Sequence, residues 1–217
     1  MGGYARTERA ALADALIEAG PHAPTLCGGW TAADLAAHLV IRESRPDAAV
    51  GIVARPAARW TARVQTALRD RTPYPRVVDR LRAGPPPWSP FRVGSLDEAA
   101  NTVEFFVHHE DLRRAAEGWE PRRLDEEFSE VLWSRLRRSA RLMFRASPVG
   151  VTLVCTAAGG GPLRTVLAKA ATPQMVTVTG EAQELLLFAF GRKDAARVES
   201  AGDESAVARL RGAKLGM

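Results

Sequence analysis

The sequence lacks long apolar runs, has almost no lysine and contains only two cysteines among its 217 residues. Cys27 and Cys155 fall far apart in segments of different character, which gives no disulfide framework and fits a reducing compartment. No apolar run approaches the roughly 18 residues of a membrane span, and the segment from Met1 to Arg9 lacks the apolar core of a signal peptide. We therefore expect a cytoplasmic protein with no membrane partner.

Positive charge is in excess, with a formal net charge of +5, but its distribution argues against binding to nucleic acid. The basic residues are mostly arginines interleaved with acids, as in residues 120–127, and the densest arginine cluster follows one predicted helix at 135–145. Much arginine and alanine beside little lysine is the bias that GC-rich coding produces without selection for phosphate binding. We therefore expect no nucleic acid among the partners.

The hydrophobic pattern is helical up to about residue 145. Leu12 and Leu16 share one face of a first helix that ends at Gly20, and Thr31 with Asp34 matches the capping pattern at the start of a second helix. The predicted helical segments are the first helix up to residue 20, then 31–45, 56–71, 95–118 with Ser95 as its cap, and 124–145. Four long amphipathic helices among these predict a four-helix bundle, an architecture that builds metal sites from inward-facing side chains.

Beyond Ser147 the hydrophobic pattern changes from helical to alternating. Strands are predicted over 149–156, 163–170 and 175–179, followed by a helix over 180–191, a short strand near 196–200 and a terminal helix from about residue 204. The predicted fold class is therefore a four-helix bundle at residues 1–147 followed by a small α+β domain at residues 148–217.

One segment of the helix at 95–118 has the spacing of metal ligands. Glu104 and His108 lie four residues apart, so one helical turn brings them onto a common face, about 6 Å apart between Cβ atoms, which suits two ligands of one ion. Asp111 continues the same stripe and can accept the imidazole N–H that a metal does not use. We expect Asp111 to orient His108 rather than to transfer protons.

His38 is the candidate for a third ligand, because it lies in the helix at 31–45 and the chain has only four histidines. A lone histidine on an apolar helix face is usually a satisfied core residue, and Glu104 with His108 could be an ordinary contact between neighbouring turns. The three residues together are stronger evidence for a metal site than any one of them alone. Glu104 falls on the buried stripe of its helix, and a buried carboxylate without a partner is costly. A divalent ion held by His38, Glu104 and His108 would compensate it and leave open positions, as catalytic zinc and non-heme iron sites do.

Arg42, His109, His22 and Cys27 are weaker candidates. Arg42 lies one turn beyond the histidine of its helix, and is either an anchor for an anionic substrate or a solvated arginine at the bundle rim. His109 is turned about 100° from its neighbour, which favours the bundle edge, and His22 follows a proline-bearing loop and is expected to be exposed. Cys27 has no evident base beside it, so it has no claim to nucleophilic catalysis and is expected to act as a small hydrophobe.

The pattern W-x-x-x-D-x-x-x-H at residues 30–38, together with E-x-x-x-H-x-x-D at residues 104–111, resembles the actinobacterial mycothiol-dependent maleylpyruvate isomerase family. That family lies within the DinB-like superfamily of metal-dependent thiol transferases. Residues 25–30 and 108–114 are most similar to a subgroup described only as metal-binding proteins. Residues 176–192 resemble the family's second domain, which is similar to sterol carrier proteins.

The resemblance implies a DinB-like bundle with a zinc-type site at His38, Glu104 and His108, and with mycothiol as a possible cosubstrate. A thiol bound to such a metal is deprotonated at neutral pH and can add to a conjugated double bond or displace a leaving group on a small electrophile. The activity expected is therefore isomerisation or S-transfer. Arg42 and Arg192 are the candidates for binding carboxylates of the substrate or the thiol, and for Arg192 this requires the second domain to fold over the bundle mouth.

Two other functions fit the same three ligands. A metal-dependent hydrolase would use bound water in place of the thiol, and activity without added thiol would identify it. A non-catalytic protein would use the metal only to staple two helices, so that removal of the metal unfolds the bundle. The sequence leaves both open, together with the choice between a monomer and a homodimer.

Overall fold

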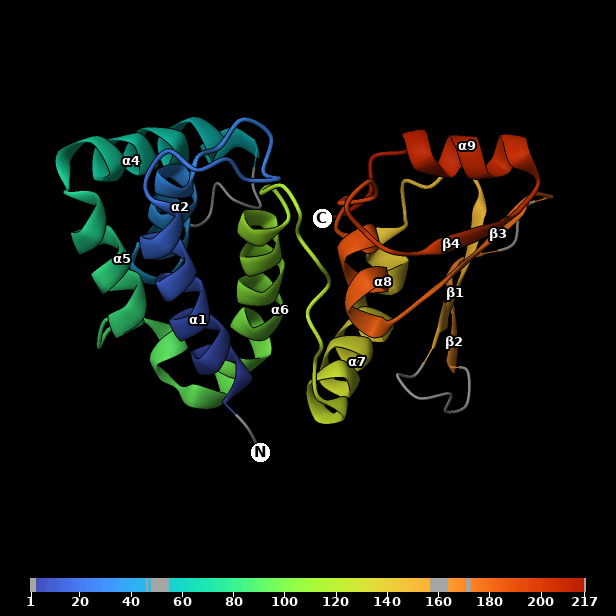
Figure 1. Ribbon diagram of the computed structural model, residues 1–217, viewed down its shortest axis with the longest axis horizontal. Coiled ribbons are helices and arrows are strands. Elements are labelled where there is room, and N and C mark those ends of the chain that lie inside the picture. The colour runs from blue at the N-terminus through green and yellow to red at the C-terminus, as the bar shows by residue number, and fades with distance from the viewer. Residues whose placement is uncertain (1–2, 46, 48–54, 157–163, 171–172, 217) are drawn as a thin grey trace. The chain divides into compact units, whose positions relative to one another are not determined.

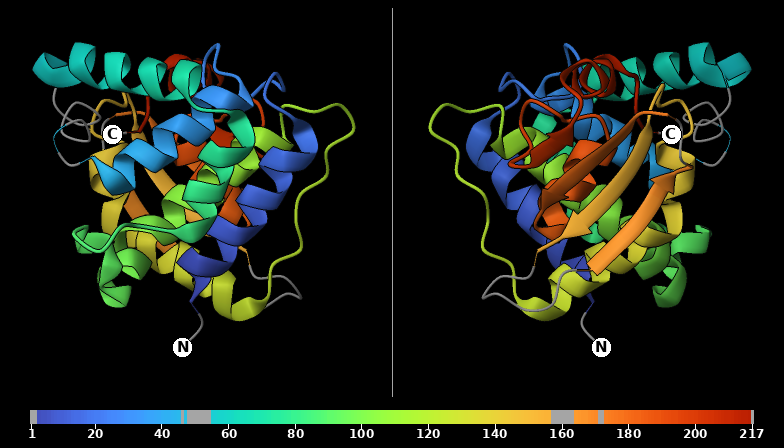
Figure 2. Two further views of the ribbon diagram at one scale, coloured as in Figure 1. Left: turned by 90° about the vertical axis from the view of Figure 1, so that its left-hand side faces the viewer. Right: turned by 90° about the vertical axis from the view of Figure 1, so that its right-hand side faces the viewer.

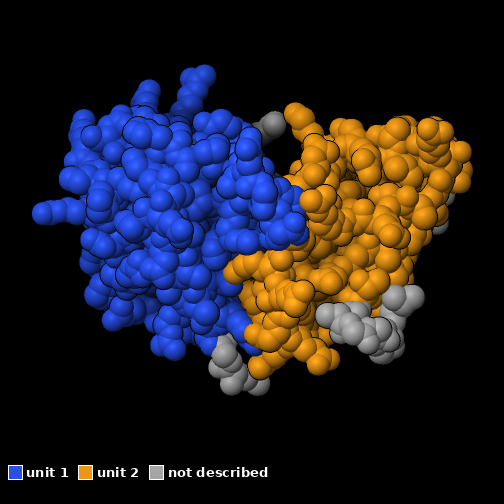
Figure 3. Space-filling model, in the orientation of Figure 1, with its two compact units in different colours: residues 1–120 blue, residues 121–217 orange. Residues whose placement is uncertain are grey.

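A computed structural model describes residues 3–45, 47, 55–156, 164–170 and 173–216. The chain divides into two compact units, Met1–Glu120 (unit 1) and Pro121–Met217 (unit 2) (Figure 3). Unit 1 is helical, whereas unit 2 combines helices with a four-stranded sheet, which confirms the coarse fold class expected from the sequence. Within the described residues, no helix is long and apolar enough to cross a membrane.

Unit 1 is built from helices (Figure 1). They surround a core rich in leucine and alanine. The elements of unit 1 are α1 (Tyr4–Ala19), α2 (Ala32–Ser44), the 3₁₀ turn η1 (Arg55–Ala57), α4 (Ala58–Arg71), α5 (Tyr74–Ala83), the 3₁₀ turn η2 (Pro90–Arg92) and α6 (Gly94–Arg113). Helix α1 packs against α5 and α6, and α2 packs against α4 and α5. Leu12, Leu16, Leu35, Leu39 and Phe105 are fully buried, so apolar contacts hold α1, α2 and α6 together.

The end of α1 and the start of α2 follow the sequence pattern. Helix α1 ends at Gly20, whose φ of 78° glycine adopts readily. Helix α2 begins with a capping box, in which the Thr31 side chain accepts from the Asp34 backbone N–H and the Asp34 carboxylate accepts from the Thr31 backbone N–H. The other Asp34 oxygen accepts from Arg69 of α4 at 2.6 Å. One carboxylate therefore both caps α2 and ties it to α4.

Two local features of unit 1 differ from expectation. Ser95 does not cap α6, because the helix begins at Gly94 and its first turn closes on the Val93 carbonyl without a capping side chain. No helix was predicted over α5. Pro75 lies in the first helical turn, where its missing N–H costs nothing, and buried residues such as Leu81 hold the helix against the core.

Unit 2 packs helices against a mixed sheet. Its elements are α7 (Glu126–Met143), β1 (Gly150–Cys155), β2 (Arg164–Lys169), β3 (Met175–Gly180), α8 (Ala182–Ala189), β4 (Glu199–Gly202) and α9 (Glu204–Gly212). The strand order is β2-β1-β3-β4, and β1 runs antiparallel to β2 and parallel to β3 (Figure 2). The first three strands, α8 and α9 lie where the sequence predicted them, and β4 begins at Glu199, near the end of the predicted 196–200.

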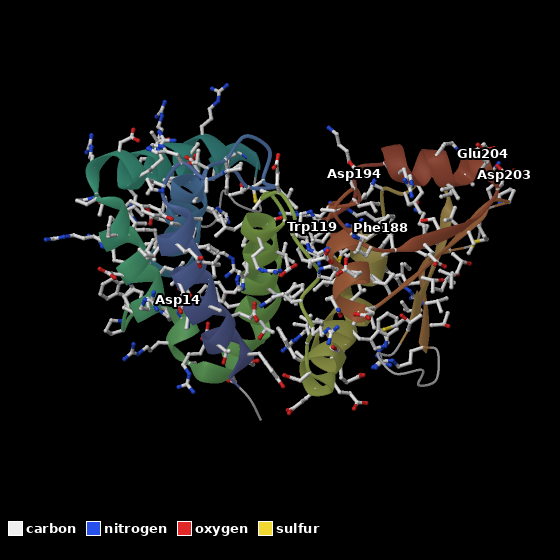
Figure 4. All side chains as sticks on the ribbon, viewed as in Figure 1. Asp14, Trp119, Phe188, Asp194, Asp203 and Glu204 are labelled. Atoms are coloured by element: carbon white, nitrogen blue, oxygen red, sulfur yellow. The ribbon has the colours of Figure 1, made fainter. Side chains whose placement is uncertain are left out.

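A ring contact and a helix cap stabilise unit 2 locally. Phe188 of α8 (Figure 4) stacks on Phe144, which lies just after α7, with ring centroids 6.4 Å apart. Asp203 caps α9 by accepting from the backbone N–H groups of Ser205 and Ala206. The first contact joins the end of α7 to α8, across the three strands that separate them in sequence, whereas the second is local and defines the start of α9.

Helix α7 is the main departure from the predicted domain organisation. It was expected to complete the N-terminal bundle, with the boundary at residue 147. Its buried side chains, among them Phe128, Leu132 and Leu136, instead belong to a helix that packs against α8 and β2. The division between the compact units consequently falls between Glu120 and Pro121, ahead of α7.

Candidate metal centre

Three side chains of unit 1 converge where α2 approaches α6. Glu104 Oε1 lies 3.3 Å from His108 Nε2 and 3.8 Å from His38 Nε2. The two imidazole rings meet edge to face, with centroids 5.5 Å apart. One potential ligand atom from each residue lies within 4.8 Å of the others. The fold thus brings together the three residues singled out in the sequence as candidate ligands.

Asp111 lies on the opposite side of the His108 ring from Glu104. Its Oδ2 is 3.0 Å from His108 Nδ1, and its side chain is fully buried. Because a carboxylate can only accept, Nδ1 must carry the hydrogen of this bond. In the neutral ring Nε2 is then unprotonated and faces Glu104. This geometry fits the expected role of Asp111 as the residue that orients His108.

The protonation equilibria of the cluster are coupled. Burial lowers the pKa of His38 below its ordinary value, and the nearby Glu104 carboxylate only partly offsets this. Burial acts in the same direction on His108, but hydrogen bonds with Asp111 and Cys27 outweigh it and raise the His108 pKa well above its ordinary value. Burial alone would raise the pKa of Glu104, yet hydrogen bonds from His108 and His38 hold it well below the usual range. Glu104 is therefore ionised at neutral pH, beside a neutral His38.

Arg42 holds Glu104 from another side. Its Nε lies 3.3 Å from Glu104 Oε1, and its two terminal nitrogens donate to the Asn101 side chain and to the Ala100 carbonyl. Phe91 of η2 covers the guanidinium, with 5.5 Å between the Arg42 Cζ and the ring centroid. These contacts let Arg42 position Glu104, and its binding of a substrate carboxylate stays a prediction.

Asn101 connects the cluster to a buried ionic network. Its Nδ2 donates to Glu43 Oε1 at 3.0 Å and to Asp97 Oδ1 at 2.7 Å, and Arg9 of α1 bridges the same two carboxylates at 2.6 and 2.8 Å. Asn101 was not among the predicted site residues. A signal for it exists in the sequence, because Asn101 lies three residues before Glu104 on the same helical stripe.

The loop between α1 and α2 brings Cys27 to the far side of His108. Its Sγ lies 3.0 Å from Asp111 Oδ2 and 3.6 Å from His108 Nδ1. The expectation that Cys27 has no base near it was therefore wrong. A backbone bond of 3.0 Å from Leu26 N–H to the Asp111 carbonyl fastens the loop to α6. With 84 positions between Cys27 and Asp111, no local pattern could have revealed the contact.

The donor set suits a transition metal of the zinc or iron type. Zinc ligands lie about 2.0–2.2 Å from the ion, so tetrahedral neighbours are roughly 3.3 Å apart. Glu104 Oε1 has nearly this separation from the two ring nitrogens, at 3.3 and 3.8 Å. Cys27, His108 and Asp111 form a second group of potential ligand atoms, but there the carboxylate already accepts from the thiol and from the ring. The first group therefore fits an ion better.

The remaining candidates are placed elsewhere. His109 is buried, with Nδ1 3.3 Å from Glu8 Oε2 of α1, so the prediction that it faces the bundle edge was wrong. The second half of α6 is buried nearly all round, which leaves no edge for it to face. His22 is exposed, as expected. Arg192 belongs to unit 2 and donates to the Phe190 carbonyl at 2.7 Å, and its binding of a carboxylate stays a prediction.

A helical unit with two histidines and one carboxylate gathered between α2 and α6 defines a candidate metal-binding domain. The model for the mycothiol maleylpyruvate isomerase N-terminal domain matches residues 4–137, so the chain belongs to this family. The match covers unit 1 and most of α7, and it confirms the resemblance seen in the sequence motifs. Comparisons with curated proteins and with solved structures found no match.

Proposed function

We propose that unit 1 holds a divalent metal ion, with zinc as the first candidate, and that the protein is an enzyme acting on a small electrophile with a low-molecular-weight thiol. Mycothiol is the thiol suggested by the family to which the chain belongs. The reaction is isomerisation or S-transfer. The observation that supports this proposal is the convergence of His38, Glu104 and His108, with potential ligand atoms within 4.8 Å of one another.

Each residue of the cluster has a distinct task in this proposal. His38, Glu104 and His108 hold the ion, and Asp111 keeps the His108 hydrogen on Nδ1 so that Nε2 is available. Arg42 fixes the direction of the Glu104 carboxylate through its 3.3 Å contact with Oε1. These contacts orient the ligands before any ion or substrate arrives.

Three protein ligands leave coordination positions for an exogenous group. A divalent ion there would lower the pKa of a bound thiol enough for the thiolate to exist at neutral pH. Glu104 keeps 21% of its side-chain surface exposed, whereas the ring of His108 keeps 11%, so the carboxylate is on the more open side of the cluster. The thiol and the electrophile would approach from that side. Arg192 of unit 2 remains a proposed binding group for a substrate or thiol carboxylate.

The first experiment measures metal content of the purified protein together with calorimetric titration by mycothiol. Wild type is compared with His108→Ala and with His22→Ala, a matched control that removes an exposed histidine of the same unit. We expect near-stoichiometric metal and thiol binding in wild type and in the control, and loss of both in His108→Ala.

Other results would select a different function. Stoichiometric metal without a thiol response, combined with turnover in the absence of thiol, would point to a hydrolase. Metal whose removal unfolds unit 1 would indicate a structural role. A wild-type protein free of metal, and unable to take up Zn²⁺ or Fe²⁺, would reject the proposal.

A further inference from the structure

The thiol of Cys27 lies beside the centre, and the proposed function gives it no task. Its Sγ is 3.0 Å from Asp111 Oδ2, the same oxygen that is 3.0 Å from His108 Nδ1. The direct distance from Sγ to His108 Nδ1 is longer, 3.6 Å. A thiol is a weak donor and a carboxylate only an acceptor, so the hydrogen of Cys27 goes to Asp111.

We propose that Cys27 is a positioning residue of the metal centre: its thiol donates to Asp111 Oδ2 and holds that carboxylate where it receives the Nδ1–H of His108. The inference rests on the proposed function, since it concerns the nitrogen that His108 would offer to the ion. Cys27 acts through Asp111 and touches neither ion nor substrate.

The Cys27–Asp111 hydrogen bond affects which ring nitrogen of His108 carries the hydrogen. A neutral imidazole carries one hydrogen, on Nδ1 or on Nε2. The Asp111 carboxylate, held beside Nδ1 by the thiol, accepts this hydrogen and keeps it there. If Asp111 turned away, the hydrogen could move to Nε2, which faces Glu104 at 3.3 Å, and would block it as a ligand. The Cys27–Asp111 bond thus favours the tautomer that a metal ligand needs.

The loop that carries Cys27 is held in place independently of the thiol. Thr25 Oγ1 donates to the Trp30 carbonyl at 2.9 Å and accepts from the Cys27 backbone N–H at 3.2 Å. The Leu26 backbone N–H donates to the Asp111 carbonyl at 3.0 Å. Trp30, at the other end of the loop, lies against His38 with ring centroids 5.0 Å apart. Loss of the thiol alone therefore leaves the loop attached, which makes substitution of Cys27 informative.

The test compares Cys27→Ala and Cys27→Ser with wild type. Cys155→Ala serves as the matched control, because it removes the other cysteine, which lies in unit 2. Affinity and the visible absorption spectrum are measured with Co²⁺ as the probe ion. In the metal-free protein, ring ¹⁵N chemical shifts of His108 are measured above its pKa and report which nitrogen carries the hydrogen.

We expect Cys27→Ala to weaken Co²⁺ binding by roughly tenfold, the lower end of the usual effect of groups that orient metal ligands, and to shift the His108 hydrogen toward Nε2. Cys27→Ser keeps a donor and should recover most of the affinity, whereas Cys155→Ala should match wild type. Wild-type affinity and ring shifts in Cys27→Ala would overturn the proposal. Equal loss in the serine and alanine variants would also overturn it, because packing rather than hydrogen bonding would then be responsible.

The proposal and the metal centre can fail separately. If wild type binds no Co²⁺, the proposed function fails. The ring ¹⁵N shifts then decide alone whether Cys27 orients His108, and unchanged shifts in Cys27→Ala would reject that role as well.

Discussion

Helix α8 and the second half of α6 are both buried nearly all round, yet they differ in the number of polar side chains that they bury. The polar residues buried in α6 are Asn101, Thr102, His108, His109, Glu110 and Asp111, whereas the centre of α8 buries Leu185, Leu186, Leu187 and Phe188. The two units differ in the same way. Among the residues that the structure describes, every buried polar or charged side chain except Ser147, Gln183 and Glu184 lies in unit 1.

The apolar core of unit 2 stabilises the fold, whereas the core of unit 1 also contains polar and charged side chains that position the candidate site. Apolar burial as in α8 contributes directly to the free energy of folding. Buried ion pairs contribute little net stability, because desolvation offsets their attraction. The interior charges of unit 1, such as Arg9 with Glu43 beside Asn101, are therefore better explained by the need to orient Arg42 and Glu104 than by stability. Substitutions in the polar core of unit 1 and in the apolar core of unit 2 test this contrast.

The largest expected effect is the loss of the metal from His38→Ala. Without the α2 ligand only two protein groups of α6 remain, and we expect stoichiometric metal binding to disappear, as measured by elemental analysis of the purified protein. His22→Ala should keep full occupancy. Full occupancy in His38→Ala would remove His38 from the site.

The next effect concerns the buried ionic network. Replacing Arg9 by Met leaves Glu43 and Asp97 without their cation, so we expect the free energy of unfolding of unit 1 to fall by about 3–5 kcal/mol in urea titrations. Arg82→Met is the matched control, because its pair with Asp14 is exposed and should be worth less than about 1 kcal/mol. Equal effects of the two substitutions would contradict the account of a charged core.

Leu185→Ala tests the apolar side of the comparison. Leu185 is fully buried in α8, and its truncation should destabilise unit 2 by roughly 3 kcal/mol. Metal occupancy should not change, because all the proposed ligands lie in unit 1. A loss of metal in Leu185→Ala would show that the two units do not behave independently.

A smaller effect is expected at the capping box of α2. Thr31→Ala removes the side chain that accepts from the Asp34 backbone N–H and should cost about 1 kcal/mol. Asp203→Ala removes the corresponding cap of α9 in unit 2 and should cost a similar amount. Thermal unfolding of the two variants measures both. A negligible effect of Thr31→Ala would mean that tertiary contacts alone define the start of α2.

The smallest effect is a pH dependence carried by Asp34. Burial would raise the pKa of Asp34, but the hydrogen bonds from Thr31 and Arg69 lower it below its ordinary value. A carboxyl whose pKa is lower in the folded state stabilises the fold above its unfolded pKa of about 3.9, and this contribution is lost as the pH falls. The difference in unfolding free energy between wild type and Asp34→Asn should therefore shrink below about pH 4. A difference that is constant from pH 3 to pH 7 would contradict this.

Local signals accounted for much of the fold. The structure contains the capping box at Thr31 and Asp34, the helix end at Gly20, β1 and β3. Each was predicted from residues close in sequence, β1 from its β-branched run and β3 from its alternation. Helix α5 was not predicted, although Pro75 in its first turn is compatible with a helix start. An amphipathic stripe shows that a helix has a partner but not which partner it has, so the pattern alone could not assign α7 to one unit.

In the candidate site too, some residues could be predicted from local spacing, whereas the place of others depends on tertiary contacts. Glu104, His108 and Asp111 share one helix, so their spacing predicted a common face, and the rarity of histidine pointed to His38. The place of Cys27 depends on how the α1–α2 loop is fastened to α6, which is a tertiary contact. The engagement of Arg42 by Asn101 likewise depends on the approach of two helices.

The distance along the chain between the parts of the centre also has a kinetic consequence. Cys27 and His108 are 81 positions apart, and His38 lies in α2, far from α6 in the sequence. Closing so long a loop is slow compared with forming a helix. Uptake of Co²⁺ by a refolding chain should therefore lag behind the recovery of helical circular dichroism, so that the colour of the metal complex marks the last step by which unit 1 reaches its native topology.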